Sequence, residues 1–206
     1  MYTPELFAER NEEAAFRLID RSPFATLIAA ATGGPPEIVH VPCFLDRGAR
    51  QLWLHVARAN SFWERVNETE VTAIFHGPHG YVSPRWYEQP RQQVPTWNYA
   101  VVHVHGRASI HLGRPTLEWI LEELSRRFEP DPEGWRTSWM DETLRAQLLG
   151  AIVGIDVRLE RVEAKVKLSQ NRSVSDRLRV AEGLEKRGSE DDLWMSNEIR
   201  ARARRT

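Results

Sequence analysis

Four short apolar segments follow one another between residues 24 and 76, and each is bounded by Gly, Pro, Asp or Asn. Segments of this length are typical of β-strands, and the turn residues between them predict antiparallel neighbours. The predicted strands are Phe24–Ala30, Ile38–Leu45, Gln51–Ala57 and Glu70–His76, joined by turns at Gly33-Gly34-Pro35-Pro36 and Asp46-Arg47-Gly48. Because strands and helices do not alternate regularly, the pattern argues against a Rossmann-type sheet.

Two longer strands are predicted further along the chain. One covers Gln93–Ile110, and the other begins at Ile152–Leu159, where apolar and charged residues alternate, and extends through Arg161–Leu168. The predicted helices begin at Thr3-Pro4-Glu5, Asn11-Glu12-Glu13 and Ser61, and cover Pro115–Phe128, Glu142–Leu149 and two charged segments after Ser173. Many short strands with helices at the start, middle and end predict an α+β fold built on a β-barrel. We expect one domain over residues 1–206, with 173–206 as a C-terminal helical extension.

Charge and composition narrow the classes of partner. The formal net charge is -1, so nothing steers the whole molecule toward a polyanion. Residues 161–206 carry 12 Lys or Arg and 8 Asp or Glu, a weak footprint for DNA, and the final Arg200–Thr206 stretch is expected to fray. The lone Cys43, the absence of a secretory leader and the lack of a membrane-length apolar stretch favour a cytoplasmic protein with no membrane partner.

Two sequence clusters combine a cation with turn residues. In His55-Val56-Ala57-Arg58-Ala59-Asn60, an arginine at a strand-to-helix junction suits a phosphate, although a surface arginine and a capping asparagine would look the same. Gly77–Tyr87 is predicted to form a rigid bend that binds a phosphate and flanks a flat ring; the alternative is a tight connection packed by Trp86 and Tyr87. Neither Gly-x-Gly-x-x-Gly nor a P-loop is present, so side chains and strand or loop backbone must hold any phosphate.

Two further clusters lie at strand ends. Val94-Pro95-Thr96-Trp97-Asn98-Tyr99 offers an indole and an amide to a heterocycle, and Lys165–Arg172 is dense in hydrogen-bond donors, or serves only as a helix cap. His103 and His105 share a strand face, but no third ligand at a matching spacing completes a metal site. No nucleophile-elbow pattern indicates a hydrolase.

Taken together, these strings resemble the PaiB family, FMN-binding proteins described as negative transcriptional regulators. The resemblance covers nearly the whole chain and is carried most specifically by two uncommon strings, Pro95-Thr96-Trp97-Asn98-Tyr99 and Lys167-Leu168-Ser169-Gln170-Asn171-Arg172. It implies the FMN-binding split β-barrel of pyridoxamine-phosphate-oxidase-like flavoproteins, with flanking helices. It also implies a homodimer with cofactor sites at the interface.

The resemblance assigns cofactor contacts residue by residue. Arg58, Asn60, Ser83 and Arg85 would contact the phosphate and ribityl chain. Thr96, Trp97 and Asn98 would approach the ring system, and Lys167, Gln170 and Asn171 would close the site. The chain departs from the family pattern at Leu54 and Ser61, where Gly and Pro are usual, and in a shorter loop at Glu88–Arg91.

Four functions remain open from the sequence. The first is the FMN-binding transcriptional regulator, and the second is an FMN-dependent oxidoreductase acting on a small-molecule substrate. The third is a haem b protein with His55 as the axial ligand, similar to barrel relatives that bind haem b and join two nitrogens in making piperazate. The alternative role of His55 is a simple hydrogen bond. The fourth is an empty barrel. No catalytic residue is assigned.

Overall fold

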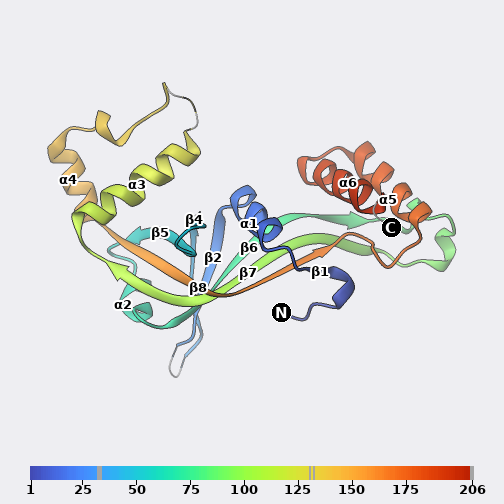
Figure 1. Ribbon diagram of the computed structural model, residues 1–206, viewed down its shortest axis with the longest axis horizontal. Coiled ribbons are helices and arrows are strands. Elements are labelled where there is room, and N and C mark those ends of the chain that lie inside the picture. The colour runs from blue at the N-terminus through green and yellow to red at the C-terminus, as the bar shows by residue number, and fades with distance from the viewer. Residues whose placement is uncertain (32–33, 130, 132, 205–206) are drawn as a thin grey trace. The chain divides into compact units, whose positions relative to one another are not determined.

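The structure is a computed structural model that describes residues 1–31, 34–129, 131 and 133–204 (Figure 1). Its strands are β1 (Ala8–Glu9), β2 (Phe24–Ala29), β3 (Glu37–Pro42), β4 (Phe44–Asp46), β5 (Gln51–Ala57), β6 (Glu70–Val82), β7 (Thr96–His111) and β8 (Ile152–Lys167). Its α-helices are α1 (Glu12–Arg21), α2 (Phe62–Val66), α3 (Arg114–Phe128), α4 (Glu142–Gly150), α5 (Val174–Arg187) and α6 (Glu190–Ala203). Short 3-10 helices cover Glu5–Phe7, Pro84–Trp86, Pro90–Gln92 and Thr137–Trp139.

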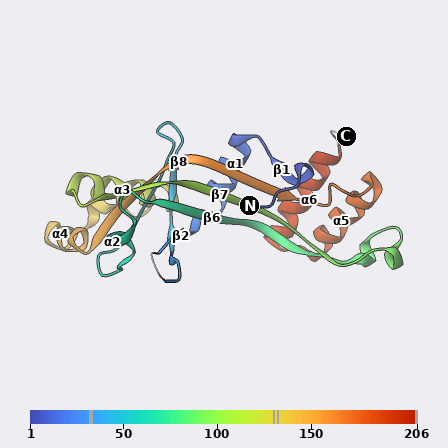
Figure 2. The ribbon, with the colours of Figure 1, turned by 90° about the horizontal axis from the view of Figure 1, so that it is seen from below.

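The described strands form one sheet in the order β3-β2-β6-β7-β8-β5-β4, and β1 pairs with β8. The chain divides into two compact units. The first unit comprises Met1–Leu18, His76–Val102 and Glu163–Thr206, and the second comprises Ile19–Phe75 and His103–Val162. Strands β6, β7 and β8, which run side by side in Figure 2, contribute residues to both units. The single domain over residues 1–206 stays a prediction, and the described part of the 173–206 extension belongs to the first unit.

Alternating apolar side chains build the core of the second unit. Leu27 of β2, Leu52 and Leu54 of β5 and Ile155 of β8 are fully buried, and the register pairs Leu54 with Ile155. Each such side chain contributes about 1.5–3 kcal/mol by leaving water. The strand alternation predicted for β5 is confirmed, because His55 lies on the opposite face, which is less buried.

Helix α3 covers part of that opposite face. Leu117, Ile120 and Leu124 recur at helical spacing and are buried. Ile120 and Leu124 pack with Phe44 and Trp53 in one cluster, so β5 is buried on both faces at Trp53. The helix therefore has one apolar side against the sheet and a charged side turned away from it.

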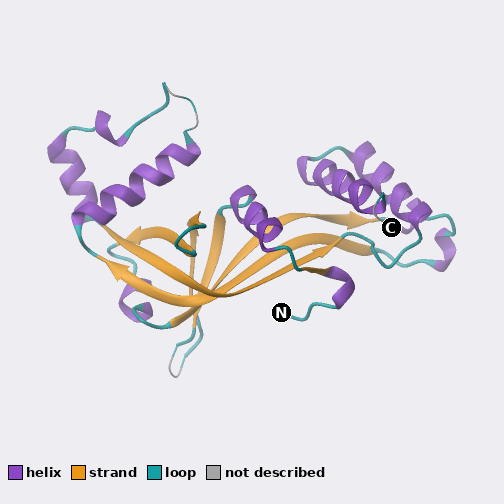
Figure 3. Ribbon diagram, in the orientation of Figure 1, coloured by secondary structure: helices purple, strands orange, loops and turns teal. Residues whose placement is uncertain are grey.

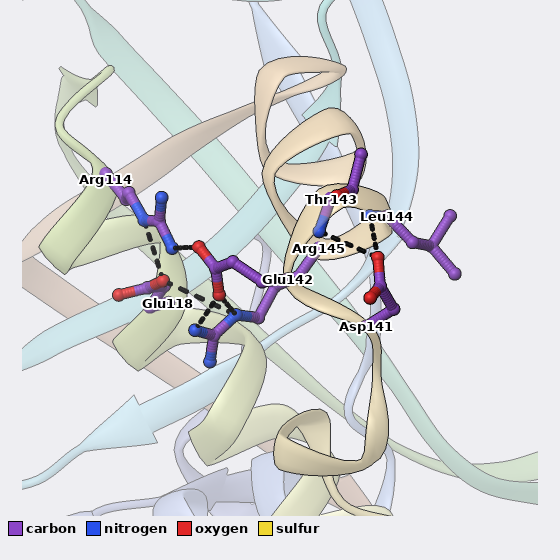
Figure 4. A network of polar contacts seen from close by, with 7 residues as sticks. All are labelled: Arg114, Glu118, Asp141, Glu142, Thr143, Leu144 and Arg145. Carbon is purple, nitrogen blue, oxygen red and sulfur yellow. Dashed lines mark hydrogen bonds and ion pairs between the residues drawn. The ribbon is translucent and has the colours of Figure 1, made fainter.

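Charged side chains join α4 to α3 within the second unit. Figure 4 shows Arg114 of α3 donating to Glu118, at 2.9 Å, and to Glu142 of α4. Arg145 donates through Nε to the same Glu142 carboxylate at 3.1 Å. Asp141 caps α4 by accepting from two first-turn amides at 2.9 and 3.3 Å. Because these ion pairs are exposed, they contribute little to the free energy of unfolding. We infer that they mainly orient α4.

Helices α5 and α6 form a helical hairpin in the first unit, here called the C-terminal hairpin, and lie side by side in Figure 3. Gly188 ends α5 with a φ of 79°, a left-handed conformation that suits glycine. Ser189 then caps α6: its Oγ accepts from the amide of Asp192 at 3.1 Å, and the Asp192 carboxylate accepts from the Ser189 amide at 3.3 Å. Val180 and Leu184 pack inside the hairpin and are fully buried.

Two predicted elements of the first unit are wrong at the chain ends. Thr3-Pro4-Glu5 opens only a 3-10 turn, Glu5–Phe7, because Ala8–Glu9 leaves it to pair with β8. The Arg200–Thr206 tail is not frayed over its described part, because α6 continues to Ala203 and Arg200 pairs with Glu185 of α5 at 2.7 Å. Residues 205–206 lie outside the described part of the chain.

Two predictions for the strands are also corrected. Ile38–Leu45 is not one strand, because the Cys43 amide turns to the Pro23 carbonyl, at 2.8 Å, between β3 and β4. The bend predicted over Gly77–Tyr87 does not begin at the glycines, since β6 continues to Val82 and neither Gly77 nor Gly80 has a positive φ. Glycine serves close packing there: a Cβ at Gly77 would lie 3.1 Å from the Ala100 carbonyl oxygen.

We predict that Asp192→Asn destabilises the protein in a pH-dependent way. The Asp192 side chain is 2% exposed and accepts from Arg187, with Nε to Oδ2 at 2.8 Å, and these bonds lower the pKa of Asp192. A carboxyl group whose pKa is lower in the folded than in the unfolded state stabilises the fold at pH values above its unfolded-state pKa. This stabilisation is lost as the pH falls through the folded-state pKa. Urea unfolding should show a loss of about 2 kcal/mol at pH near 7 that shrinks below pH of about 4.

The matched control for this prediction is Glu182→Gln on α5. Glu182 pairs with Lys186 at 2.8 Å, but both side chains are exposed, so its replacement should cost less than about 0.5 kcal/mol. Equal effects of the two substitutions, or an Asp192 effect that does not change with pH, would contradict the assignment.

Candidate functional site

The ten residues that the sequence assigns to a cofactor fall into two groups. Arg58 and Asn60 belong to the second unit, at the end of β5. The other eight belong to the first unit: Ser83, Arg85, Thr96, Trp97, Asn98, Lys167, Gln170 and Asn171. Within the first unit, the structure brings together the start of β7 and the end of β8, and the two most specific sequence strings meet there.

Lys167 makes the central contact of this group. Its Nζ donates to Thr96 Oγ1 and to the carbonyl of Trp97, both at 2.7 Å. Burial lowers the pKa of Lys167, and the nearby charges of Lys165 and Arg172 lower it further. The ammonium is therefore held in place by neutral acceptors beside two other cations.

These three cations have no carboxylate partner in the described part of the chain. Lys165 is 8% exposed; its Nζ donates to the Tyr2 carbonyl at 3.2 Å and lies 5.2 Å from the Tyr99 ring centroid. The Arg172 guanidinium lies 5.1 Å from the Tyr87 ring centroid. Aromatic faces and carbonyls stabilise cations only weakly, so the cluster has a net positive potential that favours an anion.

An open cavity lies beside Trp97 in the first unit. Its volume is about 370 Å³, and its lining includes His76, His79, Trp97 and Tyr99. The Trp97 side chain is 47% exposed, its ring centroid lies 5.8 Å from that of His79 in a stacked arrangement, and Tyr81 meets it edge-on at 6.5 Å. Cavities of this size with aromatic walls suit a flat ligand.

Two of the predicted contacts have partners inside the protein instead. Asn98 is fully buried and its Nδ2 donates to Ser169 Oγ at 3.1 Å. Gln170 donates to the Val166 carbonyl at 2.5 Å and accepts from the Leu168 amide at 2.6 Å. These bonds shape the turn after β8, where Ser169 has a φ of 62°, and Asn171 stays exposed on that turn.

Ser83 and Arg85 follow β6 in the first unit. Ser83 Oγ accepts from the Arg85 amide at 3.3 Å and so caps the Pro84–Trp86 turn. The Arg85 side chain is exposed. This segment presents a guanidinium at a short turn, as the sequence predicts, although it does so after a strand and not on a glycine bend.

Arg58 and Asn60 have structural partners within the second unit. Arg58 donates through Nε to the Gly150 carbonyl at 2.7 Å and through Nη2 to the Ile152 carbonyl at 3.1 Å. Asn60 accepts from the Phe62 amide at 2.9 Å. Arg58 thus satisfies carbonyls where α4 ends, and Asn60 fixes the entry to α2.

Sequence reasoning missed several residues of the first-unit group. Lys165 and Arg172 stand in the same string as Lys167, but the family resemblance assigns them no cofactor contact, although Lys165 lies two residues away on the same strand face. His79 and Tyr81 alternate along β6 and so share the face that meets Trp97. Alternation along a strand that continues to Val82 identifies them, but the sequence predicts a bend over Gly77–Tyr87 in place of that strand.

Sequence comparisons relate the chain to known proteins. Residues 1–161 match a family model described as "Putative FMN-binding domain". The Bacillus subtilis protein named Protease synthase and sporulation protein PAI 2 is 32% identical over 191 residues, which cover 90% of this chain and 89% of that protein. The chain belongs to the PaiB family. An uncharacterized protein of Aspergillus fumigatus is 31% identical over 65% of this chain and 59% of its own length.

Solved structures agree on the fold of this PaiB-family chain. The flavocytochrome Anf3 of Azotobacter vinelandii has a TM-score of 0.63 at 14% identity, covering 78% of this chain and 69% of its own. The FAD and heme binding protein of Mycobacterium smegmatis has a TM-score of 0.61 at 16% identity, covering 78% and 73%. The predicted α+β split β-barrel with flanking helices is confirmed. No helix in the described part of this PaiB-family chain is long and apolar enough to cross a bilayer.

His55 of the PaiB-type motif lies on β5 in the second unit, partly exposed. Its Nδ1 atom is buried and has no hydrogen-bond partner among the described residues. Burial lowers the pKa of His55 and so favours the neutral imidazole. His105, by contrast, has its Nδ1 at 3.0 Å from Thr72 Oγ1.

Proposed function

We propose that the protein binds FMN in the first unit, with the phosphate at Lys165, Lys167 and Arg172. The observation that supports this most is the three-cation cluster without a carboxylate partner in the described chain, in which Lys167 donates to the backbone carbonyl of the half-exposed Trp97. A phosphate dianion would offset most of the positive charge of the cluster, and charged donors bind phosphate more strongly than neutral ones. The family model of an FMN-binding domain matches residues 1–161, which include Trp97 but not the three cations, so it supports FMN binding and not this position of the phosphate.

The flavin ring is proposed to lie against Trp97, over the cavity that His76, His79 and Tyr99 line. Thr96 and Asn98 hold this part of β7 in place, and Gln170 and Asn171 shape the turn beside Lys167. Ser83 and Arg85 are further proposed contacts to the phosphate side. When bound, FMN supplies redox chemistry, and the protein positions it and excludes water.

We further propose a cytoplasmic homodimer in which Arg58 and Asn60 of one copy complete the site of the other. Phe24 of β2 and Ile38 of β3 are 63% and 53% exposed, which is unusual for large apolar side chains on adjacent strands. A second copy of the chain would cover such a face by two-fold symmetry. Light scattering coupled to size-exclusion chromatography would report twice the mass of one chain if this is right.

The biological role of the flavin is proposed as regulatory, following the PaiB resemblance, with an oxidoreductase acting on a small molecule as the alternative. No residue near Trp97 is assigned as a catalytic acid or base. Oxidation of a nicotinamide cofactor by the FMN-loaded protein would favour the oxidoreductase. Salt-sensitive binding to DNA, changed by FMN reduction, would favour the regulator.

Haem b is a second candidate cofactor because of His55. Burial favours the neutral imidazole, the form that binds a metal, and the buried Nδ1 of His55 has no hydrogen-bond partner among the described residues. If haem binds, His55→Ala should abolish the Soret band while His40→Ala, an exposed histidine of the same unit, should leave it unchanged. Haem binding that survives the His55 substitution would exclude this ligand.

The proposed function is tested by titrating the purified protein with FMN and with riboflavin, which lacks the phosphate. Binding at the cation cluster predicts that FMN binds at least about tenfold more tightly than riboflavin, because the phosphate contributes about 1.4 kcal/mol or more. It also predicts that inorganic phosphate competes with FMN. Equal affinities for the two flavins would contradict the proposed phosphate site, and no binding of either would contradict the function.

A further inference from the structure

The C-terminal hairpin lies outside residues 1–161, the part of the chain that matches the FMN-binding family model. The alignment with the PAI 2 protein covers 90% of this chain, so it extends beyond residue 161. Within the first unit, the hairpin contacts the segment that follows β6, Ser83–Glu88, here called the 83–88 segment. That segment includes two of the proposed cofactor contacts, Ser83 and Arg85.

Arg187 at the end of α5 is the main polar link. Its Nη1 donates to the Tyr81 carbonyl at 2.8 Å, just before the 83–88 segment. Its Nε and Nη2 donate to the Asp192 carboxylate of α6. The guanidinium also lies 5.5 Å from the Trp86 ring centroid. One side chain thus ties both helices of the hairpin to the end of β6 and to the segment after it.

Two glycines make room for this contact, one in the hairpin and one in β6. A Cβ at Gly183 of α5 would overlap the Trp86 ring, so the indole rests on helix backbone. A Cβ at Gly80 of β6 would lie 2.7 Å from Arg187 Nη2 and 2.8 Å from Met195 Cε. Glycine inside a helix or a strand costs stability, so its use at both positions indicates that close docking is specified by the sequence.

Two hydrogen bonds from backbone amides to carboxylates of the hairpin extend this contact, one before the segment and one at its end. Asp191 at the start of α6 accepts from the His79 amide at 3.1 Å. Asp176 in the first turn of α5 accepts from the Glu88 amide at 2.8 Å. Between these points, Tyr87 is buried beneath the guanidinium of Arg172, a residue of the cation cluster. The hairpin therefore holds the end of β6 just before the segment, and it contacts the segment itself at Trp86 and Glu88.

We propose that the C-terminal hairpin positions the 83–88 segment for cofactor binding, with Arg187 and Gly183 as the positioning residues. The inference rests on the proposed FMN site. Fixing Ser83 and Arg85 before the ligand arrives removes the cost of ordering them on binding, which increases affinity. The hairpin would then control how tightly the flavin is held without touching it.

The test compares Arg187→Ala with Arg200→Ala in the full-length protein. Both remove an arginine bonded to a carboxylate across the hairpin, but the Arg200 pair with Glu185 does not reach the 83–88 segment. We expect Arg187→Ala to weaken FMN binding at least about fivefold and Arg200→Ala to change it less than about twofold. Arg187→Lys should recover only part of the affinity, because an ammonium cannot replace the planar fork.

Amide hydrogen exchange of the protein without flavin separates this inference from the proposed function. Arg187→Ala should speed exchange in residues 83–88, and Arg200→Ala should not. Gly183→Ala, which displaces Trp86, should act like Arg187→Ala. Unchanged exchange in folded Arg187 and Gly183 variants would overturn the inference, as would faster exchange with unchanged FMN affinity. Failure of the unmodified protein to bind FMN would overturn the proposed function and, with it, the cofactor role of the hairpin.

Discussion

Replacing Lys167 with methionine is expected to weaken FMN binding at least about tenfold, a loss of about 1.4 kcal/mol or more, and to leave riboflavin binding nearly unchanged. The Lys167 ammonium is held by Thr96 Oγ1 and the Trp97 carbonyl at 2.7 Å, beside two cations and no carboxylate of the described chain. Methionine keeps the length of the side chain and removes its charge. Isothermal titration with the two flavins measures the difference.

The control is Lys186→Met on α5, which removes a lysine that is exposed and paired with Glu182. Its FMN affinity should match that of the unmodified protein.

The pKa of Lys167 is lowered by burial, so FMN affinity should also begin to fall at a lower pH than the ordinary lysine pKa, as the ammonium loses its proton. An equal loss of riboflavin and FMN binding in Lys167→Met would contradict a phosphate contact.

Replacing Trp97 with alanine is expected to weaken the binding of both flavins, by about 1–3 kcal/mol if the ring stacks on the indole as bases stack on aromatic side chains. Trp97 is 47% exposed and borders the cavity of about 370 Å³. Because a stacked indole quenches flavin fluorescence, bound flavin should also become brighter in the variant. Fluorescence titration measures affinity and quenching together.

Trp139→Ala is the matched control, because Trp139 is 65% exposed and belongs to the second unit. It should change neither flavin affinity nor quenching. Selective loss of FMN but not riboflavin in Trp97→Ala would place the phosphate, and not the ring, beside the indole. That result would contradict the proposed orientation.

Much of the fold was predictable because the local rules and the tertiary packing agree. Alternation over Ile152–Leu159 predicts the part of β8 that pairs with β5, and Leu54 and Ile155 meet there in the core. The helix predicted at Pro115–Phe128 is α3, whose apolar stripe packs against Trp53. These elements have one face in the core and one outside, so their periodicity is visible in the sequence.

The predictions are wrong where a residue is needed for packing against a distant neighbour and not for the conformation of its own backbone. The sequence predicts a bend over Gly77–Tyr87, yet Gly77 and Gly80 lie within β6 and leave room for Ala100 and for Arg187. Nothing local distinguishes these uses, because the neighbour that needs the space lies far along the chain. The same applies to Arg58, whose acceptors are the carbonyls of Gly150 and Ile152.

The sequence segments that form the candidate site were predictable, but the role of each residue within them was not. Lys167 and Thr96 belong to different strings, and the structure joins them directly. The resemblance predicts Asn98 and Gln170 as cofactor contacts, whereas the structure gives each of them an internal hydrogen bond. A short amide or hydroxyl side chain serves a turn or a ligand equally well, and only the tertiary neighbours decide between them.

An absorption spectrum of the purified protein, recorded after incubation with FMN or haem and removal of unbound ligand, tests FMN binding most directly. We predict retained bands of oxidised flavin that disappear in a Lys167→Met, Trp97→Ala double variant with an unchanged circular dichroism spectrum. A retained Soret band without flavin bands, or no retained chromophore at all, would contradict FMN as the cofactor of this protein.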